Sequence, residues 1–285
     1  MFNSCSQENE LIEQESFLLN DGISINNGIL TFTTVDLYDE TIQLLSSLSE
    51  VELNKWEKTY SHTSLRSESR ETELIKEIGK TFSTLLNAEK EIVIAGNFFK
   101  LDFEKGTITK QKWDETCEFK NENMNESKTF YFKDDVDIFD ENPSLKSVNG
   151  EACGYEGRLW VERNTLVDGH ALYRLEYDTW SIFRHVRAEI EPSSNPVKVW
   201  LSITAGSENK YKLYNKNQCG SMDTSVTLGG TVGSSSNISY DIYNGTNRLS
   251  AYKFKVTFKA RSRTTPTDDL DTWIVYLDCA TVNCP

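Results

Sequence analysis

Apolar residues in the first third of the chain recur at helical spacing in three short stretches. After a short alternating strand at 29–32, leucines from Leu37 to Leu48 mark one face of a first helix. Ser49 followed by Glu52 matches a capping box, which predicts the start of a second helix. The buried side of this second helix would carry Leu53, Trp56 and Tyr60. A third helix is predicted from about residue 71 to 86, so the front of the chain contains a small helical unit.

Beyond this unit, the spacing of the apolar residues changes from helical to alternating. Residues 91–108 predict two strands around a turn near Gly96 and Asn97. Residues 111–157 are weakly patterned and rich in Asn, Asp, Glu and Lys, with one expected strand at 129–133. From residue 158 onward, eight or nine short β runs are separated by clusters of Gly, Asn, Ser and Pro, which is typical of an antiparallel sandwich.

We therefore predict an α+β protein that is mostly β, with a small N-terminal helical and hairpin unit followed by an antiparallel β-sandwich. The expected organisation is a tether at 1–27, the helical and hairpin unit at 28–110, an acidic loop-rich connection at 111–157, and the sandwich at 158–285. No run of apolar residues is long enough to predict a membrane-spanning helix.

The charge is divided unevenly between the two halves. The net charge is −14, with 15 basic and 31 acidic residues in 1–157 but 15 basic and 13 acidic residues in 158–285. Binding to nucleic acid requires a basic footprint, which an acidic chain of this kind does not predict. We therefore expect no nucleic-acid partner.

The most regular alternation lies in the run YKFKVTFKAR at 252–261. Apolar side chains point to one side of this strand, and the other side carries a basic stripe of Lys253, Lys255, Lys259 and Arg261. Three interpretations are open: a groove for an anionic ligand, an edge strand that lysines protect from aggregation, or a surface that docks onto the acidic front half. The stripe is thus a candidate binding site.

Aromatic residues add a second set of candidates, because flat rings stack on sugars. Most tryptophans of the back half are expected in the core. The tyrosines near turn-rich segments are the better candidates for exposure, and they are Tyr211, Tyr214, Tyr240 and Tyr243. Exposure of all four on one face would favour glycan binding.

Motifs for catalysis or for a cofactor are absent from the sequence. There is no nucleophile elbow, phosphate-binding loop or zinc-protease motif. Glu189 and Glu191 share a strand face as a glycosidase pair would, but no third acidic residue follows them. His170 beside Asp168 also fits an ordinary turn. The sequence predicts no catalytic residue and no cofactor, and a cleft lined by Glu189, Glu191 or His170 would favour a hydrolase instead.

The six cysteines and three histidines also predict no metal site. No cysteine pair or neighbouring histidine has the spacing of zinc ligands, and the acidic run at 134–142 lacks the central Gly of a calcium loop. Cys279 and Cys284 could close a short C-terminal disulfide loop. With Cys5 set aside, five cysteines remain, so at least one would be unpaired within the chain.

The first ten residues, MFNSCSQENE, place Cys5 between small residues and a polar, acidic run. This arrangement resembles the processing site of exported lipoproteins of the Bacteroidetes, in which the cysteine becomes the lipidated N-terminus. Asn3 and the lack of an apolar segment before Cys5 depart from such sites, so we expect translation to begin further upstream. Residues 28–103, with the run LSSLSEVELNKWEK, resemble uncharacterised members of the same group.

The resemblance implies a protein at the outer membrane or cell surface, facing the periplasm or the exterior, with Cys5 as its lipid anchor. A membrane is therefore an expected partner, and more than one acyl chain would make the anchoring stable. The expected function is binding of a polysaccharide or another envelope component. The alternatives are a hydrolase of an envelope or dietary polymer, or a structural adhesin-like subunit.

Overall fold

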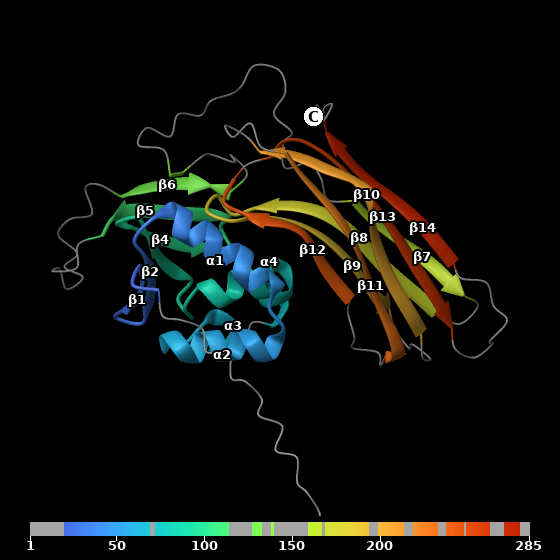
Figure 1. Cartoon of the computed structure of the whole chain (residues 1–285), viewed down its shortest axis with the longest axis horizontal. Coiled ribbons are helices and arrows are strands. Elements are labelled where there is room, and N and C mark those ends of the chain that lie inside the picture. The colour runs from blue at the N-terminus through green and yellow to red at the C-terminus, as the bar shows by residue number, and fades with distance from the viewer. Residues whose placement is uncertain are drawn as a thin grey trace, which may run out of the picture.

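The computed structural model confirms the predicted fold class, α+β and mostly β (Figure 1). The structure describes residues 20–68, 72–113, 127–132, 138–139, 159–166, 169–193, 199–213, 219–232, 238–247, 249–262 and 271–279. Within them, no helix has the length and apolar character needed to cross a bilayer.

A six-stranded sheet and four helices form the front unit. The strands lie in the order β1-β2-β3-β4-β5-β6, and every neighbouring pair is antiparallel except β2 and β3. Their bounds are β1 Ile23–Asn26, β2 Ile29–Phe32, β3 Glu91–Ile94, β4 Asn97–Asp102, β5 Thr107–Lys112 and β6 Lys128–Tyr131. All four helices lie in the connection between β2 and β3, because parallel neighbours need a long crossover.

The four helices are α1 Val35–Ser47, α2 Glu50–Tyr60, α3 Leu65–Glu68 and α4 Thr72–Leu85. Three of them, α1, α2 and α4, begin within two residues of the predicted positions, whereas the short α3 was not predicted. The capping box of α2 is confirmed, since Ser49 Oγ accepts from the Glu52 amide and Glu52 Oε2 accepts from the Ser49 amide at 2.7 Å. The third predicted helix is interrupted at Gly79, whose φ of 82° is not helical.

Two four-stranded antiparallel sheets form the back half. One sheet has the order β12-β9-β8-β7 and the other has the order β11-β10-β13-β14. Their bounds are β7 Leu159–Leu166, β8 Gly169–Thr179, β9 Arg184–Ser193, β10 Val199–Leu213, β11 Cys219–Val232, β12 Ile238–Gly245, β13 Leu249–Ser262 and β14 Asp271–Cys279. We call them the β8–β9 sheet and the β10–β13 sheet.

Aromatic side chains fill the space between these two sheets. Tyr173 of β8 stacks on Phe258 of β13 with ring centroids 5.2 Å apart, and Tyr177 meets Tyr252 edge to face at 5.6 Å. All four side chains are buried. This pairing confirms the inward phase of Tyr252 and Phe258 that the alternation of the strand predicts.

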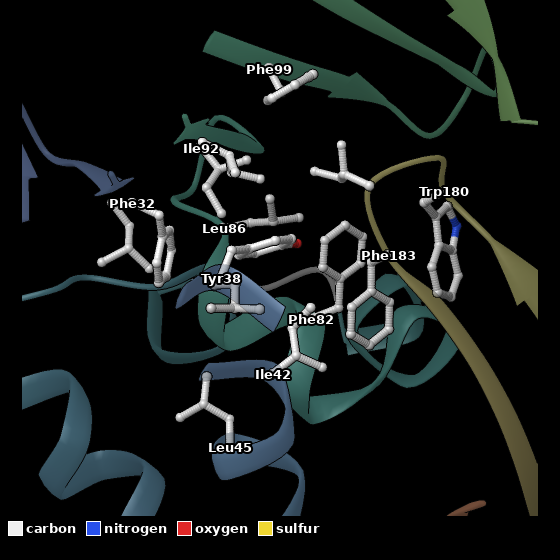
Figure 2. Packing of buried hydrophobic residues seen from close by; sticks show 14 of the residues in the cluster. Phe32, Tyr38, Ile42, Leu45, Phe82, Leu86, Ile92, Phe99, Trp180 and Phe183 are labelled. Carbon is white, nitrogen blue, oxygen red and sulfur yellow. The ribbon is translucent and has the colours of Figure 1, made fainter. Parts of the chain in front are cut away.

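The turn between β8 and β9 enters the core of the front unit. Trp180, Ile182 and Phe183 belong to the same buried cluster as the residues of α1, α4 and the front sheet (Figure 2). The rings of Phe82 and Phe183 are nearly parallel, with centroids 4.5 Å apart, and Trp180 stacks on both. The sandwich thus contributes side chains to the core of the front unit.

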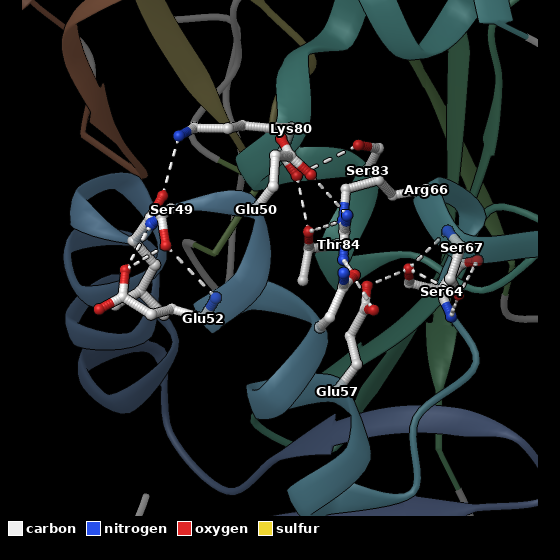
Figure 3. A network of polar contacts seen from close by, with 12 residues as sticks. Ser49, Glu50, Glu52, Glu57, Ser64, Arg66, Ser67, Lys80, Ser83 and Thr84 are labelled. Carbon is white, nitrogen blue, oxygen red and sulfur yellow. Dashed lines mark hydrogen bonds and ion pairs between the residues drawn. The ribbon is translucent and has the colours of Figure 1, made fainter. Parts of the chain in front are cut away.

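A polar network ties α2 to the start of α3 and the end of α4 (Figure 3). The Arg66 guanidinium lies 2.8 Å from carboxylate oxygens of both Glu50 and Glu57, and its Nε donates to Thr84 Oγ1. Ser64 donates to the buried Glu57 carboxylate. With each of these groups engaged by another, the network has a structural role.

His62 lies buried beside this network and makes the stability of the protein dependent on pH. Its Nε2 donates to the Thr84 carbonyl oxygen at 2.9 Å. Burial lowers the pKa of His62 to about 4, and the hydrogen bond to Thr84 offsets only part of this effect. Because the unfolded chain protonates at a higher pH, the stabilising contribution is complete above pH 6.5 and disappears as pH falls to 4.

From this shift we expect the free energy of unfolding to fall by up to about 3 kcal/mol through His62 between pH 6.5 and 4. Urea unfolding of the wild type and of His62→Gln at pH 7.5 and pH 4 measures this contribution. The glutamine amide can still donate to Thr84 but does not titrate, so the variant should lose less stability on acidification. An equal loss in both proteins would contradict the assignment to His62.

Candidate functional site

The basic stripe lies on the outer side of the β10–β13 sheet. Tyr252, Phe254, Val256 and Phe258 are buried, whereas Lys253 is exposed and Lys255 is half-buried. The strand that carries them, β13, pairs with β10 on one side and β14 on the other. One interpretation of the stripe was that its lysines protect an edge strand from aggregation. This interpretation is wrong, because β13 is an interior strand of its sheet.

A second exposed lysine stands directly opposite the stripe. Lys210 of β10 and Lys253 of β13 are register partners, and both side chains are exposed. On β14, Ile274 pairs with Thr257 and has half of its side chain exposed. We call this surface, defined by Lys210, Lys253, Lys255, Thr257 and Ile274, the basic face. Like charges at directly opposed positions destabilise a sheet, so folding alone does not favour this lysine pair.

The front unit packs against the other sheet of the sandwich (Figure 1). Asp39 of α1 accepts from the Thr246 amide at 2.9 Å, and Gln43 donates to the Asn244 carbonyl oxygen at 2.6 Å. These contacts involve β12 and the residues that follow it. Docking of the stripe onto the acidic front half is thus wrong for Lys253, which is exposed.

The remaining residues of the stripe are placed by backbone register alone. Lys259 pairs with Ser202 of β10, and Arg261 pairs with Trp200. Both continue the odd-numbered phase of Lys253 and Lys255 along β13. Asp278 of β14 is the register partner of Lys253 on the side away from Lys210.

The four candidate tyrosines do not form an exposed platform. Tyr243 is 7% exposed and its hydroxyl donates to the Asn247 carbonyl oxygen at 2.7 Å, so the expectation of exposure is wrong for this residue. Tyr211 packs on Tyr243 with ring centroids 5.0 Å apart, and burial raises the pKa of both hydroxyls. Tyr240 is half-buried, and Tyr214 lies outside the described residues.

Several other candidates also fall outside the description. Cys5, Cys284, Asp168 and the acidic run at 134–137 are not among the described residues. Cys279 is the last residue of β14, and its pairing with Cys284 stays a prediction.

Charged residues of β8 and β9 form three cross-strand pairs on the side of the sheet that faces the front unit. The register pairs Arg174 with Glu189, Glu176 with Arg187, and Asp178 with His185. We call these six residues the charge ladder. Arg174 lies 2.9 Å from Glu189 Oε2 and 3.2 Å from Glu176 Oε1, while Asp178 Oδ2 lies 3.3 Å from His185 Nε2.

Arg187 connects the ladder to the interrupted helix α4. Its guanidinium donates to the carbonyl oxygens of Lys76 at 2.5 Å and Glu77 at 3.3 Å, and its Nε pairs with Asp241 of β12 at 3.1 Å. These carbonyls lie where the helix is broken and have negative partial charge. A Cβ on Gly79 would lie 2.0 Å from Arg187 Nη2, so only glycine leaves room for this contact.

The electrostatics of the ladder are those of a buried network. Burial and the positive charge of Arg187 lower the pKa of His185, against the opposing effects of Asp178 and Asp241. For Asp241 burial raises the pKa, but the charge of Arg187 and the hydrogen bonds from Asn244 and Arg187 more than offset it, so the pKa lies below its usual range. His185 is therefore neutral at pH 7.

The hydrolase alternative gains no support from the position of Glu189, which is buried and ion-paired. Glu191 and His170 lie further along the same two strands, opposite Leu172 and Ser193. Sequence reasoning considered Glu189 only with Glu191 and missed the ladder. The alternation of charged and apolar residues in RLEYD and HVRAE was the available signal, but the partner strand had to be known.

No protein-family model and no curated protein matches the chain. Among solved structures, the crystal structure of a DUF4848 family protein from Bacteroides thetaiotaomicron matches with 11% sequence identity and a TM-score of 0.23. The match covers 90% of this chain and all of that one. A TM-score this low carries no argument about fold or function.

Proposed function

We propose that the protein binds an acidic polysaccharide at the cell envelope through the basic face. The observation that carries this proposal is the exposed pair of Lys210 and Lys253 on two interior strands. Opposed residues of neighbouring strands lie about 5 Å apart, so the two ammonium groups repel each other. An anion bound between them turns this unfavourable interaction into a favourable one.

The stripe also suits a polymer better than a small anion. Alternate residues of a strand repeat about every 6.8 Å, so Lys253 and Lys255 present positive charges in sequence along β13. Lys259 and Arg261 continue this phase along the strand. A linear polyanion that follows β13 could engage several of these charges at once, and affinity would then depend on the number of its acidic groups.

Binding of polygalacturonate, an acidic polysaccharide, tests this proposal, with neutral dextran as the comparison ligand. We expect Lys210→Gln/Lys253→Gln to bind at least about tenfold more weakly, because two charge-assisted contacts are lost. The affinity of the wild type should also fall steeply with salt, since the contacts are exposed.

The matched control is Lys58→Gln/Lys112→Gln, which removes two exposed lysines from the front unit and changes the net charge equally. It should bind polygalacturonate as the wild type does. Equal weakening by the two double variants, or equal binding of dextran, would refute a specific role for the basic face.

The proposed location rests on residues 1–10, and Cys5 is the proposed site of lipid attachment. Expression of the native gene with its upstream region, in the presence of a clickable fatty acid, tests this part separately. We expect label on the wild type and on Cys117→Ala but none on Cys5→Ala. Label that persists in Cys5→Ala would exclude the anchor and leave the test of the basic face unaffected.

A further inference from the structure

Three residues of the charge ladder bring metal-ligand atoms together in the interior. Glu176, Asp178 and His185 each offer one oxygen or nitrogen, and these atoms all lie within 4.8 Å of one another. The three residues are 0%, 2% and 0% exposed. They converge because Glu176 and Asp178 are alternate residues of β8, and His185 is the register partner of Asp178 on β9.

Guanidinium groups lie beside the carboxylates of this cluster. Arg174 pairs with Glu176 and Glu189, and Arg187 pairs with Asp241. Arg184 is in the opposite phase of β9, and its guanidinium donates to carbonyl oxygens of Ser181 and Thr246. Lys76 of α4 pairs with Glu73 at the surface. Burying ionised carboxylates next to one another is costly unless a cation accompanies them.

A buried carbonyl oxygen beside His185 supplies an independent observation. Asn244 of β12 is the register partner of His185 and is 5% exposed. Its Nδ2 donates to Ser46 Oγ at 2.9 Å and to Asp241 Oδ2 at 3.2 Å, whereas its Oδ1 has no hydrogen-bond partner among the described residues. A buried acceptor in this state is destabilising, and an amide oxygen is also a good ligand for a divalent cation.

We propose that Glu176, Asp178 and His185 bind one divalent transition-metal ion, with Asn244 Oδ1 as a further oxygen at its edge. Two carboxylates and one imidazole suit Zn²⁺ or Mn²⁺, whereas Ca²⁺ takes oxygen ligands only. Arg174 contacts both Glu176 and Glu189, so it orients a ligating carboxylate from outside the site, as is usual around bound metals.

Binding of the ion by His185 would change the contact between the His185 ring and Arg187. Ligation through Nε2 puts the ring proton on Nδ1, from which Arg187 Nη2 is 3.4 Å away. Arg187 then turns away from the imidazole and keeps its contacts to Asp241 and to the Lys76 carbonyl. The ion would join β8 to β9 just before the turn that inserts Trp180 and Phe183 into the front unit. The ion would thus stabilise the contact between the two halves of the chain.

Titration of the chelator-treated full chain with Zn²⁺, Mn²⁺ and Ca²⁺ tests the proposal by calorimetry and thermal unfolding. We expect one equivalent of Zn²⁺ or Mn²⁺ to bind and to raise Tm, with a much weaker effect of Ca²⁺. Asp178→Asn keeps the shape of the side chain but should weaken Zn²⁺ binding at least about tenfold. The matched control, Glu57→Gln, alters an equally buried carboxylate that pairs with Arg66 and should keep the response to Zn²⁺.

A spectroscopic readout keeps the proposal testable even if Asp178→Asn does not fold. The chain has three histidines, so ¹⁵N spectra of its imidazoles resolve which ring binds the ion. One equivalent of Zn²⁺ should shift the ring nitrogens of His185 and leave those of His62 unchanged, with the signals assigned from His62→Gln and His170→Gln. Absence of saturable binding, unshifted His185 signals, or an equal response of Asp178→Asn and wild type would overturn the proposal.

Discussion

Replacement of Phe183 by alanine is expected to destabilise the whole protein by about 3–5 kcal/mol. Phe183 is 1% exposed and stacks on both Phe82 of α4 and Trp180. Removing the ring loses its transfer free energy and leaves a cavity in the core of the front unit. Since Phe183 belongs to the turn between β8 and β9, the lost stability comes from the interface between the two halves of the chain.

Urea unfolding followed by far-UV circular dichroism and by tryptophan fluorescence measures this effect. The helical far-UV signal reports on the front unit, and the fluorescence sums six tryptophans from both halves, Trp180 among them. If the core is shared, both signals should shift together in the Phe183→Ala variant. Ile274→Ala is the control, since that side chain is half exposed and its loss should change stability by less than about 0.5 kcal/mol. A helical signal that keeps its wild-type midpoint would contradict a shared core.

Replacement of Arg187 by methionine should cost about 3 kcal/mol, because it leaves the largely buried Asp241 carboxylate without its guanidinium. The Arg187 side chain is 3% exposed and that of Asp241 is 14% exposed. The change also removes the donors to the Lys76 and Glu77 carbonyls at the break in α4. Methionine retains much of the length of the arginine stem, so lost volume is a small part of the expected effect.

The double variant Arg187→Met/Asp241→Asn separates the unpaired charge from the lost helix contact. Neutralising Asp241 should restore about half of the unfolding free energy that Arg187→Met loses. The half that is not restored would measure the lost contact with α4. Lys100→Met is the control for an exposed pair, because Lys100 is half exposed beside Glu91 and should contribute less than about 1 kcal/mol. A double variant no more stable than Arg187→Met would show that the unpaired Asp241 charge is not the main cost.

Local features of this fold were predictable from the sequence because their causes are local. The capping box of Ser49 and Glu52 needs only residues three apart, and it lies where the pattern predicts it. The alternation of buried and exposed residues from Tyr252 to Phe258 follows from the geometry of a single strand. The two strands around Gly96 and Asn97 are confirmed for the same reason.

Errors arose where the answer depends on which strands are neighbours. The lysines of β13 are compatible with an edge strand, and the sheet order places β13 inside the sheet. Tyr243 lies near turn residues, but a tyrosine from the other sheet packs on its ring and buries it. In both cases the environment of the residue is made by parts of the chain far away in sequence.

The sequence by itself determined most of the secondary structure, the mostly β class and the basic side of β13, since these depend on spacing within one segment. Only the tertiary structure decided that Lys210 stands opposite Lys253 and that β8 and β9 align their charges into a ladder. It also decided that Trp180 and Phe183 complete the core of the front unit. Pairing between strands and packing between units are set by the summed burial of many distant residues, which no single segment encodes.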